Sequence, residues 1–336
     1  MQDTDDLEHI MAGVHPDDWS AFFEISDQFR PKTEESWRSI AARLGGGRRT
    51  YSAVELARIH AAARRYFDEP ADATNLLHRA LYEFAVSEEM IRRLPFLNLG
   101  YHPAADEKAG AIALGGDLKR FQCNLNLYTQ ALGAVRLGGR DVVEIGSGRG
   151  GGAAALVRYH EPRSYIAIDG CRRQVETCRA LYPQVKFLYG NACAIPLPDA
   201  SADVVLNVES SHCYSDLGAF VAEVRRVLRP GGLFCLTDIV YEKSLITRYF
   251  ELLHQNFQVQ RQVDVTAKVV RCLEAHGEEQ FLNWIASIGG KPAHPAQSVS
   301  MIARAFLPLD IAPWSNYRVL TSGGSIYLTF ACVKTV

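Results

Sequence analysis

The stretch Val142-Val143-Glu144-Ile145-Gly146-Ser147-Gly148-Arg149-Gly150-Gly151-Gly152 joins a short apolar run to a glycine-rich turn, and a helical pattern over 153–159 follows. Glycines let a backbone approach a ligand closely, and the first N–H groups of the following helix give that ligand a positive electrostatic environment. The glycines at 146, 148 and 151 also satisfy the dinucleotide fingerprint. The stretch alone therefore predicts a nucleotide-binding turn without choosing the nucleotide.

Short apolar runs alternate with helical segments from this stretch onward, at residues 142–145, 165–168, 185–188, 203–208 and 233–239. This alternation predicts a mostly parallel, doubly wound α/β sheet with helices on both faces. Near the C-terminus, residues 318–320 and 325–332 flank Thr321-Ser322-Gly323-Gly324, which predicts an antiparallel hairpin. The expected fold is Rossmann-like, with about seven strands.

The remaining regions are expected to be helical. Apolar residues recur at helical spacing before residue 94, and a loop rich in proline and glycine follows. We predict a helical N-terminal extension over residues 1–115 and a ligand-binding domain over 116–336. Residues from about 242 to 313 break the alternation and predict a helical cap inserted into that domain. The N-terminal helices are the surface expected to mediate any homo-oligomer.

Composition excludes several classes of protein. The 336 residues carry 36 Lys and Arg against 38 Asp and Glu, so the formal net charge of -2 provides no general attraction to nucleic acid or anionic membranes. No apolar run reaches the roughly 18 residues of a spanning helix, and the N-terminus does not resemble a signal peptide. The eight cysteines form no C-x-x-C pair, which argues against zinc and against a disulfide framework. We expect a cytoplasmic protein that acts on a small molecule.

Polar residues follow the later strands at the same predicted edge of the sheet. Asp169 closes the second strand, where a carboxylate can accept hydrogen bonds from two ribose hydroxyls in either an NAD or an S-adenosylmethionine site. Gly190-Asn191-Ala192 follows the third strand, residues 207–212 follow the fourth, and residues 227–233 lead into the fifth. The order of these motifs, rather than any one of them, distinguishes the two cofactors.

Taken in order, residues 141–239 resemble a class I S-adenosylmethionine-dependent methyltransferase, whose motifs are E-x-G-x-G-x-G, an acid closing the second strand, G-D-A and L-(R/K)-P-G-G. More narrowly, residues 126–128, 148–152, 207–214 and 220–228 resemble the phthiotriolone and phenolphthiotriolone dimycocerosate O-methyltransferase branch and related natural-product methyltransferases. The resemblance covers residues 121–241 well and the first hundred residues hardly at all. It specifies the cofactor far better than the methyl acceptor.

The resemblance implies a set of residues that bind S-adenosyl-L-methionine. The glycines would line its methionine part, Asp169 would bind the ribose, and Asn207 would form the floor beneath the sulfonium. Asn191 replaces the usual Asp that contacts the adenine amino group, and its side-chain oxygen can accept that bond without charge. The full set is Tyr128, Glu144, Gly146, Ser147, Gly148, Gly150, Asp169, Gly170, Asn191, Ala192 and Asn207.

Methyl transfer needs mainly a nucleophile held in line with the carbon–sulfur bond. If that nucleophile is a hydroxyl, His212 is the candidate base, since its ordinary pKa lies near neutrality. A loop histidine that only shapes the pocket is the alternative. Glu209 is the second catalytic candidate, either as a base or as a carboxylate that orients His212. Acceptor contacts are expected from Tyr101, His212, Tyr214 and Asp238, and no metal is expected.

The function expected from the sequence is O-methylation of a small, fairly apolar natural product. Three alternatives stay open. The same cofactor half could serve C- or N-methylation, including methylation of an isoprenoid alkene. The glycine turn could belong to an NAD-dependent oxidoreductase. The chain could also be a catalytically silent binding protein that keeps the fold and uses its N-terminal helices to hold a partner.

Overall fold

The architecture is taken from a computed structural model of the chain, which describes residues 94–104, 112–241, 243–275, 320–321 and 323–335. All of them belong to one compact unit, formed by residues 87–283 and 319–336. The predicted helices before residue 94 and the second half of the predicted cap lie outside the described residues. The expected division at residue 115 stays a prediction.

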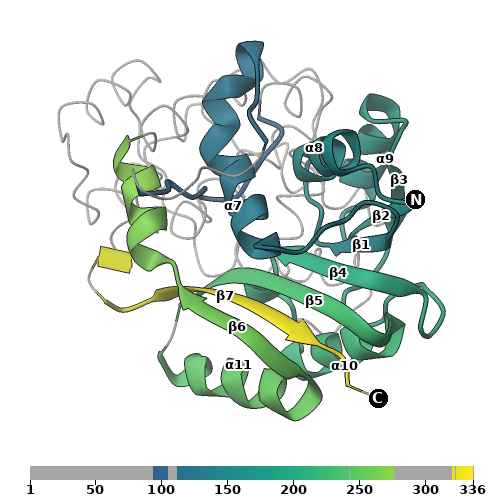
Figure 1. The fold of residues 1–336 in the computed structure, drawn as a ribbon, viewed down its shortest axis with the longest axis vertical. Helices are drawn as coiled ribbons and strands as arrows, with labels where there is room; N and C mark the ends of the chain where they lie inside the picture. Colours follow the sequence, from purple (N-terminus) through teal and green to yellow (C-terminus); the bar gives the residue numbers. More distant parts are fainter. Residues whose placement is uncertain (1–93, 105–111, 242, 276–319, 322, 336) are drawn as a thin grey trace, which may run out of the picture. The chain divides into compact units, whose positions relative to one another are not determined.

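One seven-stranded sheet forms the centre of the unit (Figure 1). Strands β3, β2, β1, β4 and β5 run parallel in that order, and β7 lies antiparallel between β5 and β6. The Rossmann-like prediction is thereby confirmed. The strands are β1 (Asp141–Ile145), β2 (Ser164–Asp169), β3 (Lys186–Tyr189), β4 (Ala202–Val208), β5 (Leu228–Val240), β6 (Gln258–Asp264) and β7 (Ile326–Val333).

The antiparallel strand was expected to pair with residues 318–320, and this pairing is wrong. Leu320 and Thr321 are helical, while β7 pairs with β5 on one side and with β6 on the other. Strand β6 lies inside the interval that was expected to form a helical cap. Its sequence, Gln258 to Asp264, is mostly polar, as suits an edge strand in which five of the seven residues are exposed.

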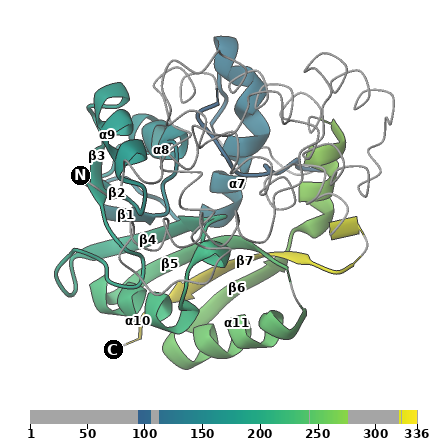
Figure 2. The same ribbon diagram turned by 180° about the vertical axis from the view of Figure 1, so that it is seen from behind.

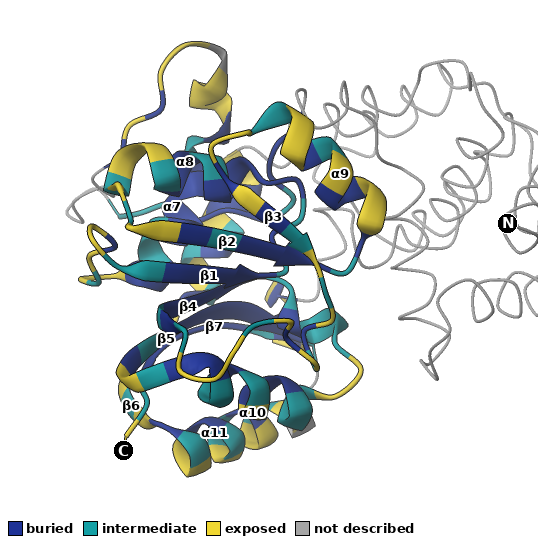
Figure 3. Ribbon diagram, turned by 90° about the vertical axis from the view of Figure 1, so that its right-hand side faces the viewer, coloured by how far each residue is buried: buried dark blue, intermediate teal, exposed yellow. Residues whose placement is uncertain are grey.

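Helices cover both faces of the sheet (Figures 2 and 3). One face carries α7 (Gln122–Leu132), α8 (Gly151–His160) and α9 (Arg172–Leu181), and the other carries α10 (Leu217–Val227) and α11 (Lys243–Asn256). A further helix spans 266–275, and short 3-10 turns occupy Gly116–Phe121 and Ser211–Cys213. None of the described helices is both long enough and apolar enough to cross a membrane.

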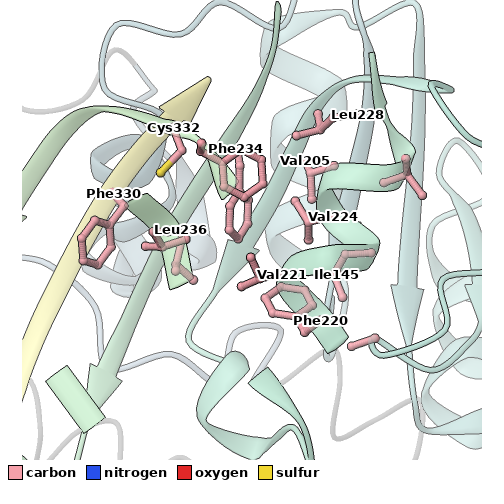
Figure 4. Packing of buried hydrophobic residues seen from close by; sticks show 14 of the residues in the cluster. Ile145, Val205, Phe220, Val221, Val224, Leu228, Phe234, Leu236, Phe330 and Cys332 are labelled. Atoms are coloured by element: carbon pink, nitrogen blue, oxygen red, sulfur yellow. The ribbon is translucent and has the colours of Figure 1, made fainter. Parts of the chain in front are cut away.

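The core between the sheet and α10 and α11 combines aliphatic side chains with several aromatic rings (Figure 4). Phe220 of α10 is fully buried, packs edge-on against Phe234 of β5 at 5.9 Å, and lies 4.8 Å from the ring of Tyr214. Helix α10 starts at a capped position, because the Asp216 side chain accepts the backbone N–H of Ala219 at 3.0 Å. This packing fixes the position of the loop after β4 relative to β5.

Segment 94–101 lies against the carboxyl end of the sheet. The carbonyl of Pro95 accepts the N–H of Gly151, the first residue of α8, at 3.1 Å. At the other end, the N–H of Tyr101 donates to Cys123 in α7 at 2.8 Å. This segment therefore connects the glycine turn to the helix that covers β4, β5 and β7.

An ion-pair network lies at the opposite, amino end of β1 and β4. Asp141 and Asp203 each contact both Arg163 and Arg229, with N–O distances between 2.5 and 3.1 Å. Hydrogen bonds from Arg163 and Ser164, the largest causes, hold the pKa of Asp141 far below its ordinary value. This end of the sheet is charged, balanced and partly solvated.

Candidate active site

The glycine turn follows β1 and has the backbone that only glycine adopts without strain. Gly146, Gly148 and Gly150 have φ values of 73°, 52° and 74°. A Cβ at Gly146 would lie 2.2 Å from Ser210 Oγ, whereas a Cβ at Gly148 would meet only Leu97, at 3.7 Å. One side of the turn is therefore packed against the loop after β4. The other side has room for a ligand.

Glu144 lies beneath the turn and is completely buried. Its two oxygens accept hydrogen bonds from Tyr128 Oη at 3.0 Å and from Tyr165 Oη at 2.8 Å. Burial raises the pKa of Glu144 to about 7, and the two phenols offset part of that rise. Glu144 and Tyr128 both belong to the cofactor-binding set that the resemblance implies, and here the Tyr128 phenol is bonded to Glu144.

Asp169 ends β2 beside the turn and is 8% exposed. Its carboxylate accepts the N–H of Gly148 at 2.7 Å and the N–H of Cys171 at 2.9 Å. Burial raises its pKa, against the effect of these two bonds. Oδ1 also accepts a long hydrogen bond from Gln174 Nε2 at 3.5 Å, whereas Oδ2 accepts the N–H of Gly148, so Oδ2 could accept a ribose hydroxyl without losing its contact to the turn.

The adenine-side residues lie next to Asp169. A Cβ at Gly170 would meet only the carbonyl of Gly190, at 3.9 Å, so this backbone is also open to a ligand. Asn191 is exposed, and its Oδ1 accepts the N–H of Cys193 at 2.9 Å. Ala192 is buried in the core cluster. The side chain of Asn191 thus stabilises its own turn.

Asn207, Ser210 and Tyr214 form a polar cluster on the packed side of the turn. Asn207 Nδ2 lies 2.8 Å from Ser210 Oγ, 2.9 Å from Tyr214 Oη and 3.0 Å from the carbonyl of Ile145. Among the described residues, Asn207 Oδ1 and Ser147 Oγ are buried without a hydrogen-bond partner. Unmet polar atoms beside an open backbone are what a polar ligand would satisfy. The phenol of Tyr214, expected at the acceptor, contacts Asn207 and Ser210 beside the turn.

His212 and Asp238 form a dyad at the ends of β4 and β5. His212 Nδ1 lies 2.6 Å from Asp238 Oδ1, and the Asp238 side chain is 2% exposed against 19% for that of His212. Burial opposes the charged imidazole, but Cys213 and the charge and hydrogen bond of Asp238 outweigh it and raise the pKa of His212 well above its ordinary value. The dyad leaves Nε2 as the ring nitrogen that can serve a substrate.

Asp238 is held by further hydrogen-bond donors. It accepts the N–H of His212 at 3.1 Å, the N–H of Ile239 at 2.8 Å and the hydroxyl of Ser211 at 2.5 Å. Ser211 Oγ also lies 3.0 Å from Tyr249 Oη on α11. Ser211 was not predicted as a site residue, although it stands inside the 207–214 motif.

Glu209 does not orient His212 in this structure. Its Oε2 accepts the N–H of Leu99 at 2.8 Å and the phenol of Tyr327, a buried residue of β7. Burial raises the pKa of Glu209 to about 7, although both bonds and the nearby His212 lower it. The carboxylate that contacts the histidine is Asp238. Tyr327 belongs to no recognisable motif, and only its position opposite Ile239 in the sheet shows that it lies at this site.

Tyr101, the remaining predicted acceptor residue, is buried beside α7. Its backbone bonds Cys123 and Asn126. Burial lowers the pKa of Arg261 on β6, and the phenol of Tyr101 opposes part of that shift, so Tyr101 and Arg261 are neighbours. Tyr101 is therefore not brought together with His212 by any contact recorded between described residues.

The predicted residues form two adjacent groups at one edge of the sheet. The cofactor-side group surrounds the glycine turn and Asp169, and the acceptor-side group contains Glu209, His212 and Asp238. None of the carboxylates of Glu144, Asp169 and Glu209 takes part in an ion pair with Lys or Arg of the described residues. Within that same part of the chain, no cluster of three or more His, Cys, Asp or Glu could hold a metal. A cationic ligand therefore fits this edge.

Comparisons with known proteins agree with this geometry. A family model described as a methyltransferase domain matches residues 143–236. A phthiotriol/phenolphthiotriol dimycocerosates methyltransferase of Mycobacterium tuberculosis is 38% identical over 152 residues, which cover 45% of this chain and 56% of the relative. A fatty-acid O-methyltransferase of Mycolicibacterium smegmatis is 34% identical over 196 residues, covering 54% and 70%. The solved structure of the cyclase SpnF has a TM-score of 0.52 at 19% identity, covering 74% of this chain and 93% of that one.

The chain belongs to the class I S-adenosylmethionine-dependent methyltransferase family. It spans just over half the length of the dimycocerosates relative from M. tuberculosis. The likeness to SpnF shows the fold alone, and the name of that protein illustrates that the fold does not fix the reaction. The reaction and acceptor must be argued from the site.

Proposed function

We propose that the chain transfers the methyl group of S-adenosylmethionine to an oxygen atom of a small, lipid-like acceptor. The observation that carries the proposal is the His212–Asp238 dyad, which lies at the same edge of the sheet as the open glycine turn. The names of the two mycobacterial relatives support a lipid-like acceptor. The aromatic residues near the dyad, Tyr241 at 5.5 Å from the His212 ring among them, offer an apolar surface for it.

The cofactor side of the proposal rests on Gly146, Gly148, Gly150, Asp169 and Asn191. When bound, S-adenosylmethionine supplies a methyl group on a positively charged sulfur. The open backbone at Gly148 admits its methionine part, and Asp169 accepts its ribose hydroxyls. Carboxylates without cationic partners in the described part of the chain favour a positive ligand over a neutral or negative one.

His212 has the position of a general base for a hydroxyl acceptor. Asp238 binds Nδ1, which leaves Nε2 to take the hydroxyl proton as the oxygen attacks the methyl carbon. The proton then rests on an imidazolium that Asp238 stabilises. Because the pKa of His212 is raised, the rate should increase with pH until this histidine has lost its proton.

A carboxylate acceptor is a second candidate, favoured by the same raised pKa and by the name of the fatty-acid relative. A carboxylate needs no base, and a protonated His212 would bind it through Nε2–H. The rate should then fall as pH rises and His212 loses its proton. The two acceptor classes thus predict opposite pH dependences for one enzyme.

The test is transfer of a labelled methyl group to a long-chain alcohol and to the fatty acid of equal length, measured against pH. Replacing Asp238 by Asn should lower the pKa of His212 and move either profile to lower pH. His212→Ala should lower the rate by about 100-fold or more if the histidine is the base. Full activity of His212→Ala across pH would remove it from the mechanism. Labelled carbon or nitrogen products would indicate C- or N-methylation, and binding without any product would indicate a silent protein.

A further inference from the structure

Glu209 has a positive φ angle, which is unusual for a residue other than glycine. Its φ is 51°, in the left-handed region that residues with a Cβ disfavour. Its N–H nevertheless donates to the carbonyl of Thr237 on β5 at 2.7 Å, which holds the strained residue in place. Such strain persists when a side chain is needed at that position. The contacts of the carboxylate indicate what it is needed for.

One oxygen of Glu209 joins two segments that are distant in sequence. Oε2 accepts the backbone N–H of Leu99 at 2.8 Å and the phenol of Tyr327. Leu99 lies in the middle of segment 94–101, and Tyr327 is fully buried in β7. Both hydrogen bonds go to the same oxygen, so Oε2 is occupied in joining these two segments.

The other contacts of segment 94–101 go to α8, to the glycine turn and to α7. Pro95 bonds Gly151 at the start of α8, and Leu97 faces Gly148 across the open side of the turn. Asn98 and Tyr101 bond α7. Among the described residues, the hydrogen bond from the N–H of Leu99 to Glu209 Oε2 ties this segment to the loop after β4.

We propose that Glu209 is a positioning residue that, together with Tyr327, holds segment 94–101 over the glycine turn and thereby sets the affinity for the cofactor. The effect on cofactor affinity rests on the proposed function, whereas the effect on the position of segment 94–101 does not. This role replaces the sequence-based expectation that Glu209 acts as a base or orients His212. The role of Glu209 therefore requires an oxygen at residue 209 that accepts hydrogen bonds, but it does not require a negative charge.

The first test measures amide hydrogen exchange at Leu99 in the full chain without ligand. Glu209→Ala should accelerate exchange at Leu99 by about tenfold or more, because the bond to the carboxylate is lost. Glu209→Gln should stay within about threefold of the parent, because the amide oxygen can accept both bonds. The N–H of Tyr101, bonded to Cys123, is the internal reference.

Tyr327→Phe keeps the test decisive if Glu209→Ala fails to fold. It removes one of the two bonds and should accelerate exchange at Leu99 by a smaller factor. Tyr165→Phe is the matched control, because it also removes a buried phenol from a carboxylate, Glu144, yet does not touch Leu99. Equal exchange at Leu99 in the parent, Glu209→Ala and Tyr327→Phe proteins would overturn the proposal, as would acceleration in Tyr165→Phe of the same size.

The second test measures the affinity for S-adenosylhomocysteine and the methyl-transfer rate at saturating substrates. Glu209→Ala should bind about tenfold more weakly, while Glu209→Gln should keep both affinity and rate. If Glu209→Gln loses about 100-fold in rate at unchanged affinity, Glu209 is a base and the proposal is wrong. Failure of the parent protein to bind would instead contradict the proposed function, and the exchange measurement would still decide the role of Glu209.

Discussion

Strand β1 carries a carboxylate near each of its ends, and the two lie in opposite environments. Asp141, at the amino end, contacts two arginines, and hydrogen bonds from Arg163 and Ser164 lower its pKa strongly. Glu144, three residues further, is completely buried against two phenols, and burial raises its pKa to about 7. The amino end thus pairs its charges with one another. At the carboxyl end, Glu144, Asp169 and Glu209 form no ion pair with Lys or Arg of the described residues, which suits a cationic ligand.

Of the variants that test this contrast between the two ends, Glu144→Ala is expected to change the unfolding free energy most. The change leaves the phenols of Tyr128 and Tyr165 without their acceptor in the core, so unfolding free energy should fall by about 3–5 kcal/mol. Glu144→Gln, which keeps a hydrogen-bonding group in the same space, should cost less than about 1.5 kcal/mol. Urea unfolding measures both values. Equal losses in the two variants would mean that the phenols do not depend on this acceptor.

A smaller effect should appear in the pH dependence of stability. Glu144 has an unfolded pKa of 4.5 and a folded pKa of about 7, so the folded state binds the extra proton between these values. Its contribution is complete below pH 4.5 and is lost as pH rises towards 7, with an upper limit of about 3 kcal/mol. The unfolding free energy of Glu144→Gln should therefore vary less than that of the parent over this interval.

Asp141 is the control for this pH dependence, because its pKa is shifted in the opposite direction. Its folded pKa lies below the unfolded value, so its contribution is present above the unfolded pKa and is lost as pH falls through the folded one. Asp141→Asn should flatten the acid limb of the stability curve and leave the interval from 4.5 to 7 unchanged. A flattened neutral interval in Asp141→Asn would contradict the separation of the two ends.

The smallest effect is expected from Arg163→Gln. The Arg163 side chain is 58% exposed, so solvent and salt screen its contacts with Asp141 and Asp203. A slight loss of stability should disappear between about 0.1 M and 1 M salt. The affinity for S-adenosylhomocysteine should not change, because this residue lies at the amino end. A weaker affinity at either salt concentration would show that the two ends are coupled.

The sequence predicted the parallel part of the sheet because β1, β2, β4 and β5 are buried apolar runs. It could not predict β6, because Gln258–Asp264 is a polar edge strand whose place depends on pairing with β7. For the same reason, the antiparallel partner of β7 was predicted in the nearby residues 318–320 instead of in β5 and β6. Local turn signals do not reveal a partner more than sixty residues away.

The candidate site shows the same limit. The glycine turn and the motif containing His212 are local, so their residue types indicated their place. The partners of the catalytic candidates come from other strands: Asp238 of β5 binds His212, and Tyr327 of β7 binds Glu209. Asp238 had been noted only as an acceptor contact. Which carboxylate meets which partner depends on strand order and register, and no pattern within one segment contains that information.

The most direct test of the account is a calorimetric titration of S-adenosylmethionine, S-adenosylhomocysteine and NAD into the parent protein and into Asp169→Ala. The account predicts micromolar binding of the first two ligands but not of NAD. It also predicts that Asp169→Ala weakens binding by roughly 1–3 kcal/mol, because charge-assisted hydrogen bonds to the ribose are lost. Binding of NAD alone, or unchanged affinity in Asp169→Ala, would contradict the assignment of this edge of the sheet to the cofactor.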